Sequence, residues 1–349
     1  MRALTPLVMR FGAMEDMVLL IPALKALQQR YGRPCELVTS GSWSRPLMER
    51  VPACGPVHLL TSRRAPYLVN RSQWRLVDTL RQRPTGPVYL FESDEKSLSL
   101  LGRGGVKPEW ICSLRDLAPL PGEHVATHAL RFAHQTPTAL IGRPEFSVTR
   151  TVAPDARPVL READRSDCAA WLAHRHITGA QLVLFQIGHR KAAGRRDNVD
   201  SWPEKNWGEV IAGVRQLLPS SCVLICGTPA ERRLAENIMD EVPGRRDGIL
   251  IATNDLPLPR LLALQERAHS QIGLHTGPAY SAAAMGCPEV VMSTRAPRTG
   301  PDCEPLPTTA PMRVIYPDLG QPGAGLDAIT PSTLITAWHE VVTGFWQQR

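Results

Sequence analysis

The fold is decided by residues 6–31, PLVMRFGAMEDMVLLIPALKALQQRY. Residues 6–11 are apolar apart from Arg10 and predict a buried strand, whereas apolar side chains recur at helical spacing between residues 17 and 31. Residues 12–16 form the turn between them, and a second strand is predicted at 35–39. A strand, a helix and a strand in this order predict a parallel sheet with a right-handed crossover.

The same unit recurs along the chain. Further strands are predicted at 56–60, 88–91, 181–186, 221–227, 248–252 and 270–274, with intervening helices that include 202–218, 230–240, 259–268 and 278–285. Residues 142–161 are rich in Pro and Arg and have little periodicity, which is typical of a linker. We therefore expect an α/β protein with two Rossmann-like doubly wound domains, 1–155 and 156–330, that face a central cleft. A C-terminal helix within 331–349 is expected to pack back on the N-terminal domain.

Composition narrows the possible functions. The chain has 349 residues and a net charge of +7, yet only five of its 40 basic residues are Lys and the Arg residues are spread along the chain. No nucleic-acid-binding module is recognisable, so a nucleic acid partner is not expected. No apolar run approaches the ~20 residues that span a bilayer, and no signal peptide is evident, which favours a cytoplasmic protein.

The sequence gives little indication of a metal site. Eight cysteines are scattered, several within apolar runs, as is typical of buried reduced thiols. His124 and His128 are four residues apart on a predicted helix and could be a metal pair, but ordinary helix histidines are the simpler interpretation. We expect no metal and no cofactor.

Open parallel sheets bind ligands beyond the carboxyl ends of their strands, which places the loops at 12–16, 187–201, 227–230 and 275–278 on the candidate face. The chain has no G-x-G-x-x-G or Walker A pattern after its first strand, which argues against dinucleotide dehydrogenases and kinases. In the first of these loops, Asp16 has two interpretations. It could simply cap the following helix, or it could take a proton from an attacking hydroxyl.

Two helix starts in the second half suit a phosphate. Asp200 to Glu204 is a strong helix start beside Lys191, Arg195 and Arg196. Trp202 and Trp207, within and after it, are typical of packing residues. The run from His275 to Pro288 combines a Thr-Gly-Pro turn with an Ala-rich helix whose N-terminus would point at the cleft.

Together these pieces resemble the glycosyltransferase family 9 heptosyltransferases, which have the two-domain GT-B fold. Residues 10–24 are similar to the family's S-x-x-G-D segment followed by T-x-P-A-L, with Asp16 on its general base. Trp202-Pro203 with Trp207 resembles K-x-W-P-x-x-x-[WYF], and Gly227 with Glu231 resembles the loop that meets the nucleotide ribose. Thr276-Gly277-Pro278 with Gly286 and Pro288 resembles D-T-G-x-x-H-L-x-A-A-x-G-x-P.

The resemblance implies transfer of a heptose or related sugar from an ADP-activated donor to a lipopolysaccharide core or other surface glycan, with inversion and without a metal. Asp16 would be the catalytic base and Glu231 would hold a ribose hydroxyl. The candidate donor-binding residues are Lys191, Arg195, Arg196, Ser201, Trp202, Glu231, His275, Thr276, Gly277 and Pro278. The candidate acceptor-binding residues are Arg63, Arg64, Lys96 and Arg103. Lipid-anchored acceptors imply peripheral contact with the cytoplasmic face of the inner membrane.

The chain also departs from the family pattern. Glu15 replaces the Gly before the general base, Asp200 replaces a phosphate-contacting Lys, and His275 and Tyr280 replace an Asp and a His. These departures leave two alternatives open. One is a transferase with a different donor or a protein acceptor, and the other is a non-catalytic protein that binds nucleotide sugars or glycans.

Overall fold

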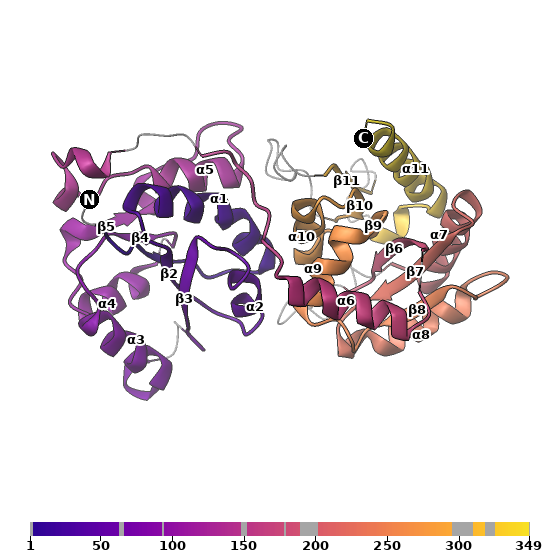
Figure 1. Ribbon diagram of the computed structural model, residues 1–349, viewed down its shortest axis with the longest axis horizontal. Coiled ribbons are helices and arrows are strands. Elements are labelled where there is room, and N and C mark those ends of the chain that lie inside the picture. Colours follow the sequence, from indigo (N-terminus) through magenta and orange to yellow (C-terminus); the bar gives the residue numbers. More distant parts are fainter. Residues whose placement is uncertain are drawn as a thin grey trace. The chain divides into compact units, whose positions relative to one another are not determined.

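The computed structural model describes residues 3–62, 66–92, 94–147, 152–177, 179–188, 202–294, 310–317 and 325–348. The chain divides into two compact units, Met1–Val159 and Leu160–Arg349 (Figure 1). The division falls inside the predicted linker, close to the predicted boundary after residue 155.

The first unit is a five-stranded parallel sheet with the order β3-β2-β1-β4-β5. Helices α1 and α5 lie on one face and α3 and α4 on the other (Figure 1). The strands are β1 (Leu7–Met9), β2 (Cys35–Thr39), β3 (Cys54–Leu59), β4 (Val88–Leu90) and β5 (Ile111–Ser113). The helices are α1 (Met14–Tyr31), α2 (Ser44–Met48), α3 (Arg71–Gln82), α4 (Glu95–Arg103) and α5 (Val125–Ala133), with short 3-10 turns at Tyr67–Val69 (η1), Pro108–Trp110, Leu114–Asp116, Thr138–Leu140 and Pro144–Phe146.

Local sequence explains the leading element of this unit. All three residues of β1 are buried, as expected of the central strand of a sheet covered on both faces. Helix α1 buries Val18, Ile21 and Leu24 and ends at Gly32, whose φ of 76° suits the left-handed position that stops a helix. The sequence therefore predicted this strand-helix unit correctly, apart from the start of the helix, which lies three residues earlier than residue 17.

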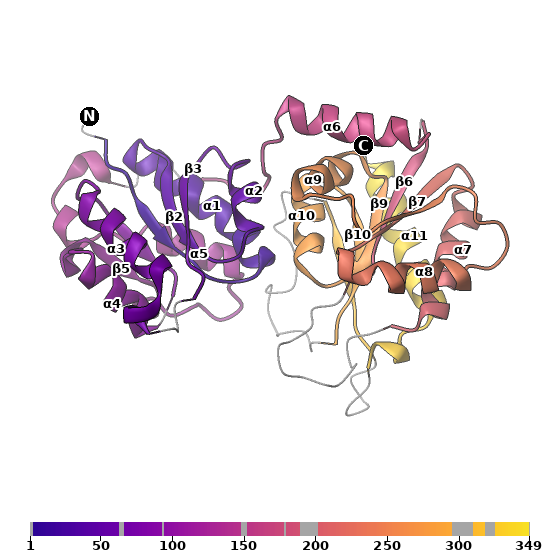
Figure 2. The ribbon, with the colours of Figure 1, turned by 90° about the horizontal axis from the view of Figure 1, so that it is seen from below.

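The second unit is a six-stranded parallel sheet with the order β11-β10-β9-β6-β7-β8. Helices α7, α8 and α11 cover one face, and α6, α9 and α10 cover the other (Figure 2). The strands are β6 (Gln181–Gln186), β7 (Ser221–Cys226), β8 (Ile249–Ala252), β9 (Ser270–Leu274), β10 (Glu289–Met292) and β11 (Met312–Ile315). The helices are α6 (Glu162–His174), α7 (Glu204–Leu217), α8 (Arg232–Glu241), α9 (Leu258–Arg267), α10 (Gly277–Met285) and α11 (Pro331–Gln347), with 3-10 turns at Pro229–Glu231 (η6) and Leu326–Ala328.

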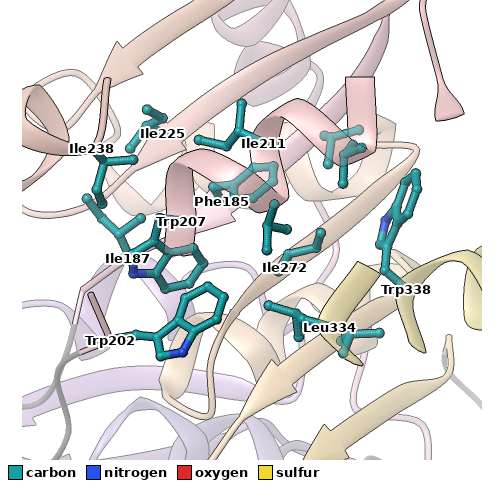
Figure 3. Close-up of a cluster of buried hydrophobic side chains, with 14 of the residues drawn as sticks. Phe185, Ile187, Trp202, Trp207, Ile211, Ile225, Ile238, Ile272, Leu334 and Trp338 are labelled. Atoms are coloured by element: carbon teal, nitrogen blue, oxygen red, sulfur yellow. The ribbon is translucent and has the colours of Figure 1, made fainter. Parts of the chain in front are cut away.

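The expected position of the C-terminal helix was wrong. Helix α11 belongs to the second unit, where Leu334, Trp338 and Val342 complete the core beneath β9 and β10 (Figure 3). The Trp338 indole N–H donates to the Ser270 hydroxyl at 2.8 Å. An apolar stripe on a helix buries itself wherever a sheet face is uncovered, and here that face is in its own unit.

Both sheets have strand orders of the doubly wound type, which confirms the predicted fold class. The order reverses between β1 and β4 in the first unit and between β6 and β9 in the second. Ligands of such sheets bind beyond the carboxyl ends of the strands at these switch points. None of the helices in the described ranges is both long and apolar enough to cross a membrane.

Candidate functional site

Three charged side chains meet at the switch point of the first unit. The Arg10 guanidinium, just after β1, donates to the Phe91 carbonyl at 3.0 Å and to Asp16 Oδ1 at 2.8 Å. Glu92, just after β4, is buried and accepts a hydrogen bond from the Phe11 backbone N–H at 2.8 Å. Its Oε1 lies 3.8 Å from Arg10. One arginine thus contacts two carboxylates, one in the first turn of the helix that follows β1 and one just after β4.

Asp16 is held in a folded-back position over the backbone of its own turn. It lies in the first turn of α1, and its Oδ2 accepts a hydrogen bond from the Ala13 N–H at 2.8 Å. A Cβ at Gly12 would fall 2.7 Å from Asp16 Cγ and closer still to Oδ2, so only glycine leaves room for the carboxylate. The Asp16 side chain nevertheless remains 31% exposed. It therefore caps the helix and is also accessible to a hydroxyl, so both sequence interpretations fit the geometry.

The expected acceptor residues lie in different places. Lys96 is exposed in the first turn of α4, which follows β4 at the edge of the sheet that carries Asp16. Arg103 lies in the last turn of the same helix, with its guanidinium 4.5 Å from the centre of the Tyr67 ring. Arg63 and Arg64 lie outside the described residues. Of the two that are described, only Lys96 starts near the edge that holds Asp16.

A second folded-back carboxylate lies at the carboxyl edge of the second unit. Glu231, at the end of η6, accepts hydrogen bonds from the Thr228 N–H at 2.6 Å and from the Thr228 hydroxyl at 2.9 Å. It packs against two glycines at strand ends, because a Cβ at Gly188 would fall 2.6 Å from its Cδ and one at Gly227 would fall 2.8 Å from its Oε2. Glu231 thus reaches from the loop after β7 to the loop after β6, beside the switch point.

Helix α10 begins at the same edge, directly after β9. His275 donates its backbone N–H to the Met292 carbonyl at 2.9 Å, and its ring stacks on Tyr280 with centroids 5.3 Å apart and planes 20° apart. The Thr276 hydroxyl donates to the Leu274 carbonyl at 3.3 Å. Gly277 and Pro278 open the helix, which places the positive end of the helix dipole at this edge. Pro278 has no N–H, and the Ala279 N–H donates to the Thr276 carbonyl at 2.9 Å.

A buried polar cluster fixes the first turn of α10. The Pro278 carbonyl receives side-chain hydrogen bonds from Gln265 (2.9 Å), Gln271 (3.3 Å) and Ser281 (3.0 Å). Gln271 also donates to Glu289 Oε2 at 2.8 Å. Burial raises the pKa of Glu289 well above its usual value. Three side chains on α9, β9 and α10 therefore converge on one carbonyl at the helix start.

The expected donor contact of Trp202 was wrong. Its side chain is buried in the core of the second unit, packs edge to face on Trp207 with centroids 5.0 Å apart, and donates its indole N–H to the Ile329 carbonyl at 3.0 Å (Figure 3). Helix α7 begins at Glu204, after Pro203, instead of at Trp202. A large aromatic between a strand end and a helix start fills the core, as the packing interpretation anticipated. Four other donor-binding expectations, Lys191, Arg195, Arg196 and Ser201, lie outside the described residues, as does Asp200.

The histidines of the candidate metal pair contact backbone groups, and the cysteines are free thiols, most of them buried. His124 Nδ1 accepts from the Ala126 N–H at 3.1 Å, and His128 Nε2 lies 2.9 Å from the Leu117 carbonyl. The seven cysteines in the described ranges are free, and burial raises the pKa of Cys54 and of Cys226 to about 12. Within those ranges no group of three His, Cys, Asp or Glu side chains could hold a metal ion.

Sequence reasoning missed three residues at the switch points. Arg10 is the one charged residue near the end of a predicted strand and Glu92 directly follows another, so their positions alone could have placed them at the carboxyl edge. Gly188 lies in the predicted loop at 187–201, but its contact with Glu231 depends on a residue far along the chain that no local pattern connects to it. Chemically, the first unit offers a partly exposed carboxylate held by an arginine. The second offers a helix N-terminus suited to an anion, beside a carboxylate suited to hydroxyl groups.

Comparison with known proteins places this fold among glycosyltransferases. No family model and no curated protein sequence matches the chain. Its structure is similar to a family 9 glycosyl transferase from Veillonella parvula, with a TM-score of 0.76 and 16% identity over 99% of each chain. It is also similar to ADP-heptose lps heptosyltransferase II from E. coli, with a TM-score of 0.71 and 14% identity over 97% of this chain and 99% of that one.

A third similar structure contains a nucleotide. The E. coli heptosyltransferase WaaC with ADP has a TM-score of 0.66 and 14% identity, over 97% of this chain and 99% of that one. The chain therefore has the GT-B type fold of these enzymes along nearly its whole length.

Proposed function

We propose that the protein is a glycosyltransferase that moves a heptose, or a related sugar, from an ADP-activated donor to a lipopolysaccharide core or other surface glycan. The observation that carries this proposal is the position of Asp16. It is a partly exposed carboxylate at the switch point of the first unit, held by Arg10 and Ala13, in a fold shared along nearly its whole length with heptosyltransferases. The proposed acceptor side is the first unit and the proposed donor side is the second.

In the proposed reaction, Asp16 takes the proton of an acceptor hydroxyl as that oxygen attacks the anomeric carbon of the donor. The new C–O bond forms on the face opposite the nucleotide, so the configuration inverts. The bond from the anomeric carbon to the diphosphate oxygen breaks, and its electron pair leaves with ADP. Arg10 keeps the carboxylate of Asp16 in place at 2.8 Å and offers it a compensating charge.

The second unit would receive the leaving nucleotide. The positive N-terminus of α10, with the Thr276 hydroxyl, would meet the diphosphate, and Glu231 would accept a hydrogen bond from a ribose hydroxyl. Because these dipoles stabilise the developing negative charge, we propose a reaction without a metal ion and without a cofactor. Gly277 and Pro278 contribute by starting the helix at this point, and His275 contributes through its ring beside Tyr280.

The acceptor assignment extends this proposal. Lys96, at the edge of the first unit that carries Asp16, would meet an anionic group of the glycan, and Arg63, Arg64 and Arg103 are proposed for the same role. The buried free thiols support a reducing compartment, which suits an enzyme at the cytoplasmic face of the inner membrane.

One observation favours a second candidate, a non-catalytic protein that binds a nucleotide sugar. His275 and Tyr280 stack on each other where the resembling motif has an Asp and a His, so a charged pair of the donor side is replaced by an aromatic one. The same change is compatible with a transferase that uses a different sugar or nucleotide, or one that acts on a protein.

Calorimetry and thermal shift with ADP-heptose, ADP and UDP-sugars test the donor, and Asp16→Asn separates binding from catalysis. We expect selective stabilisation by ADP-heptose in both the wild type and Asp16→Asn, because Asp16 belongs to the other unit. Transfer to acceptor should fall by about 100- to 10,000-fold in Asp16→Asn. Binding without turnover in the wild type would support the non-catalytic candidate, whereas no nucleotide binding would exclude both.

A further inference from the structure

One surface of the first unit combines exposed apolar side chains with arginines. Leu68 and Val69, in η1, are 80% and 74% exposed, the highest values among the large hydrophobic side chains in the described ranges. Trp74, on α3, is 41% exposed. The segment lies between β3 and α3 (Figure 1), so it leaves the sheet at the carboxyl edge that also carries Asp16.

The fold holds these side chains outward. The Trp74 indole N–H donates to the Tyr67 carbonyl at 2.7 Å, which ties η1 to α3. Asn70 is buried, accepts the Ser72 N–H at 3.0 Å as the cap of α3, and donates to the Ser62 carbonyl at 2.7 Å. Because the backbone on both sides of Leu68 and Val69 is fixed by these bonds, their exposure is a built feature of the surface.

Positive charge surrounds the apolar side chains. Helix α3 buries Gln73, Leu76, Val77 and Leu80, which leaves Arg71 and Arg75 on the exposed face with Trp74. Six arginines and a single acidic residue, Asp78, lie between residues 61 and 83, and Asp78 lies 3.8 Å from Arg81. Among the residues that the structure describes, no carboxylate forms an ion pair with Arg71 or Arg75.

We propose that this surface, formed by Leu68, Val69, Trp74, Arg71 and Arg75, docks on an anionic phospholipid bilayer. The two aliphatic side chains would enter the boundary between headgroups and acyl chains, Trp74 would lie at headgroup level, and the arginines would meet lipid phosphates. An anionic bilayer suits the surface because positive charge surrounds exposed aliphatic and tryptophan side chains, the combination that interfacial segments present to lipid. If the acceptor is lipid-linked, as the proposed function holds, docking here brings it to the edge that holds Asp16. Only the delivery of a lipid-linked acceptor rests on the proposed function, and the docking itself does not.

Flotation with vesicles tests the surface on the full chain. We expect binding to vesicles of phosphatidylglycerol mixed with phosphatidylcholine, little binding to phosphatidylcholine alone, and weakening as added salt screens the charges. Arg71→Gln/Arg75→Gln should lower the apparent affinity by about fivefold per arginine. Leu68→Ser/Val69→Ser should lower it by on the order of tenfold or more. Ile141→Ser is the matched control, because Ile141 is 68% exposed in the same unit but outside the surface.

The outcomes distinguish the proposal from its rivals. Failure of the wild type to bind anionic vesicles, equal binding to phosphatidylcholine alone, or an equal loss in Ile141→Ser would overturn it. So would self-association of the wild type that disappears in Leu68→Ser/Val69→Ser, since the surface would then join two copies of the chain. Nucleotide binding by the same variants, measured by calorimetry, should be unchanged. A wild type that binds vesicles but no nucleotide would refute the proposed function and leave the surface standing.

Discussion

Gly12→Ala tests the folded-back position of Asp16. The added Cβ would lie 2.7 Å from Asp16 Cγ and 2.8 Å from Asp16 Cβ, whereas an ordinary contact begins at 3.4 Å. The carboxylate must therefore move by at least about 0.7 Å to relieve the contact with Cγ alone. This movement breaks or lengthens the 2.8 Å bonds from Ala13 and Arg10. The backbone of Gly12 has no left-handed φ, so the side chain and not the dihedral angle causes the effect.

Opposing contributions set the stability of the variant. Loss of the cap bond to Ala13 costs about 1 kcal/mol, and loss of the partly exposed Arg10–Asp16 ion pair costs up to about 1 kcal/mol more. Replacing Gly by Ala restricts the unfolded chain and returns roughly 0.4–1 kcal/mol. The net loss is therefore about 0–1.6 kcal/mol, and the melting temperature should fall by no more than about 6 °C. Activity has no such compensation, because a shift near 1 Å in a catalytic group costs on the order of 100-fold in rate.

The assay is transfer at saturating donor, with donor affinity measured separately by calorimetry. We expect kcat to fall on the order of 100-fold with unchanged donor affinity, because the proposed donor residues belong to the other unit. Gly102→Ala is the control: Gly102 lies in α4 with nothing within 4 Å of an added Cβ, so activity should be retained. Wild-type kcat in a folded Gly12→Ala protein would refute the argument that the position of Asp16 matters.

Three further predictions concern the second unit. Gly188→Ala should displace Glu231 and weaken ADP binding, measured by calorimetry, by about tenfold, because one hydrogen bond to a charged group is worth roughly 1.5 kcal/mol or more. The kcat at saturating donor should stay unchanged. An unchanged ADP affinity would show that Glu231 is not part of the nucleotide site. The pKa of Glu289 is raised in the folded protein, so its contribution to stability is present below its unfolded pKa and is lost as the pH rises through the folded pKa. At alkaline pH, Glu289→Gln should therefore unfold at a higher urea concentration than the wild type. Under acid conditions the difference between the two urea midpoints should be smaller. An equal difference at both pH values would show that Glu289 does not titrate this way. Trp202→Ala should lower the free energy of unfolding, measured with urea, by about 3–5 kcal/mol. Trp202→Phe should keep the wild-type donor affinity. A selective loss of donor affinity in Trp202→Phe would show that Trp202 contacts the donor.

Much of the fold followed from pattern, because long amphipathic helices and apolar strands leave a clear period in the sequence. The eight predicted strands are all present, most within one or two residues of the predicted ends. The strands β5, β10 and β11 were missed, since they have only three or four residues each and the first follows a 3-10 turn. Such short segments carry too few residues for a period to be recognised unless a longer apolar run surrounds them, as it does at β1 and β4.

The candidate site was less predictable, for a physical reason. Asp16, Glu231 and Thr276 stand at strand-to-helix turns, where local sequence already indicates a loop at the carboxyl edge. The Arg10–Asp16 ion pair and the packing of Glu231 on Gly188 depend on how separate segments meet, and no local pattern encodes that. The predicted donor contact of Trp202 was wrong for the opposite reason. The role was assigned from a motif position, whereas the side chain is buried in the core.

The place of α11 has a consequence for the order in which the chain folds. The first unit contains all of its strands before residue 114, so it can form its core while the rest is still being synthesised. The second unit cannot, since Leu334, Trp338 and Val342 fill the core against β9 and β10, which left the ribosome some forty residues or more earlier. Until residues 331–347 emerge, one face of that nascent sheet has nothing to cover part of its apolar surface. A newly made second unit therefore depends on its last helix, and the interval before that helix arrives is when chaperones have the most to bind.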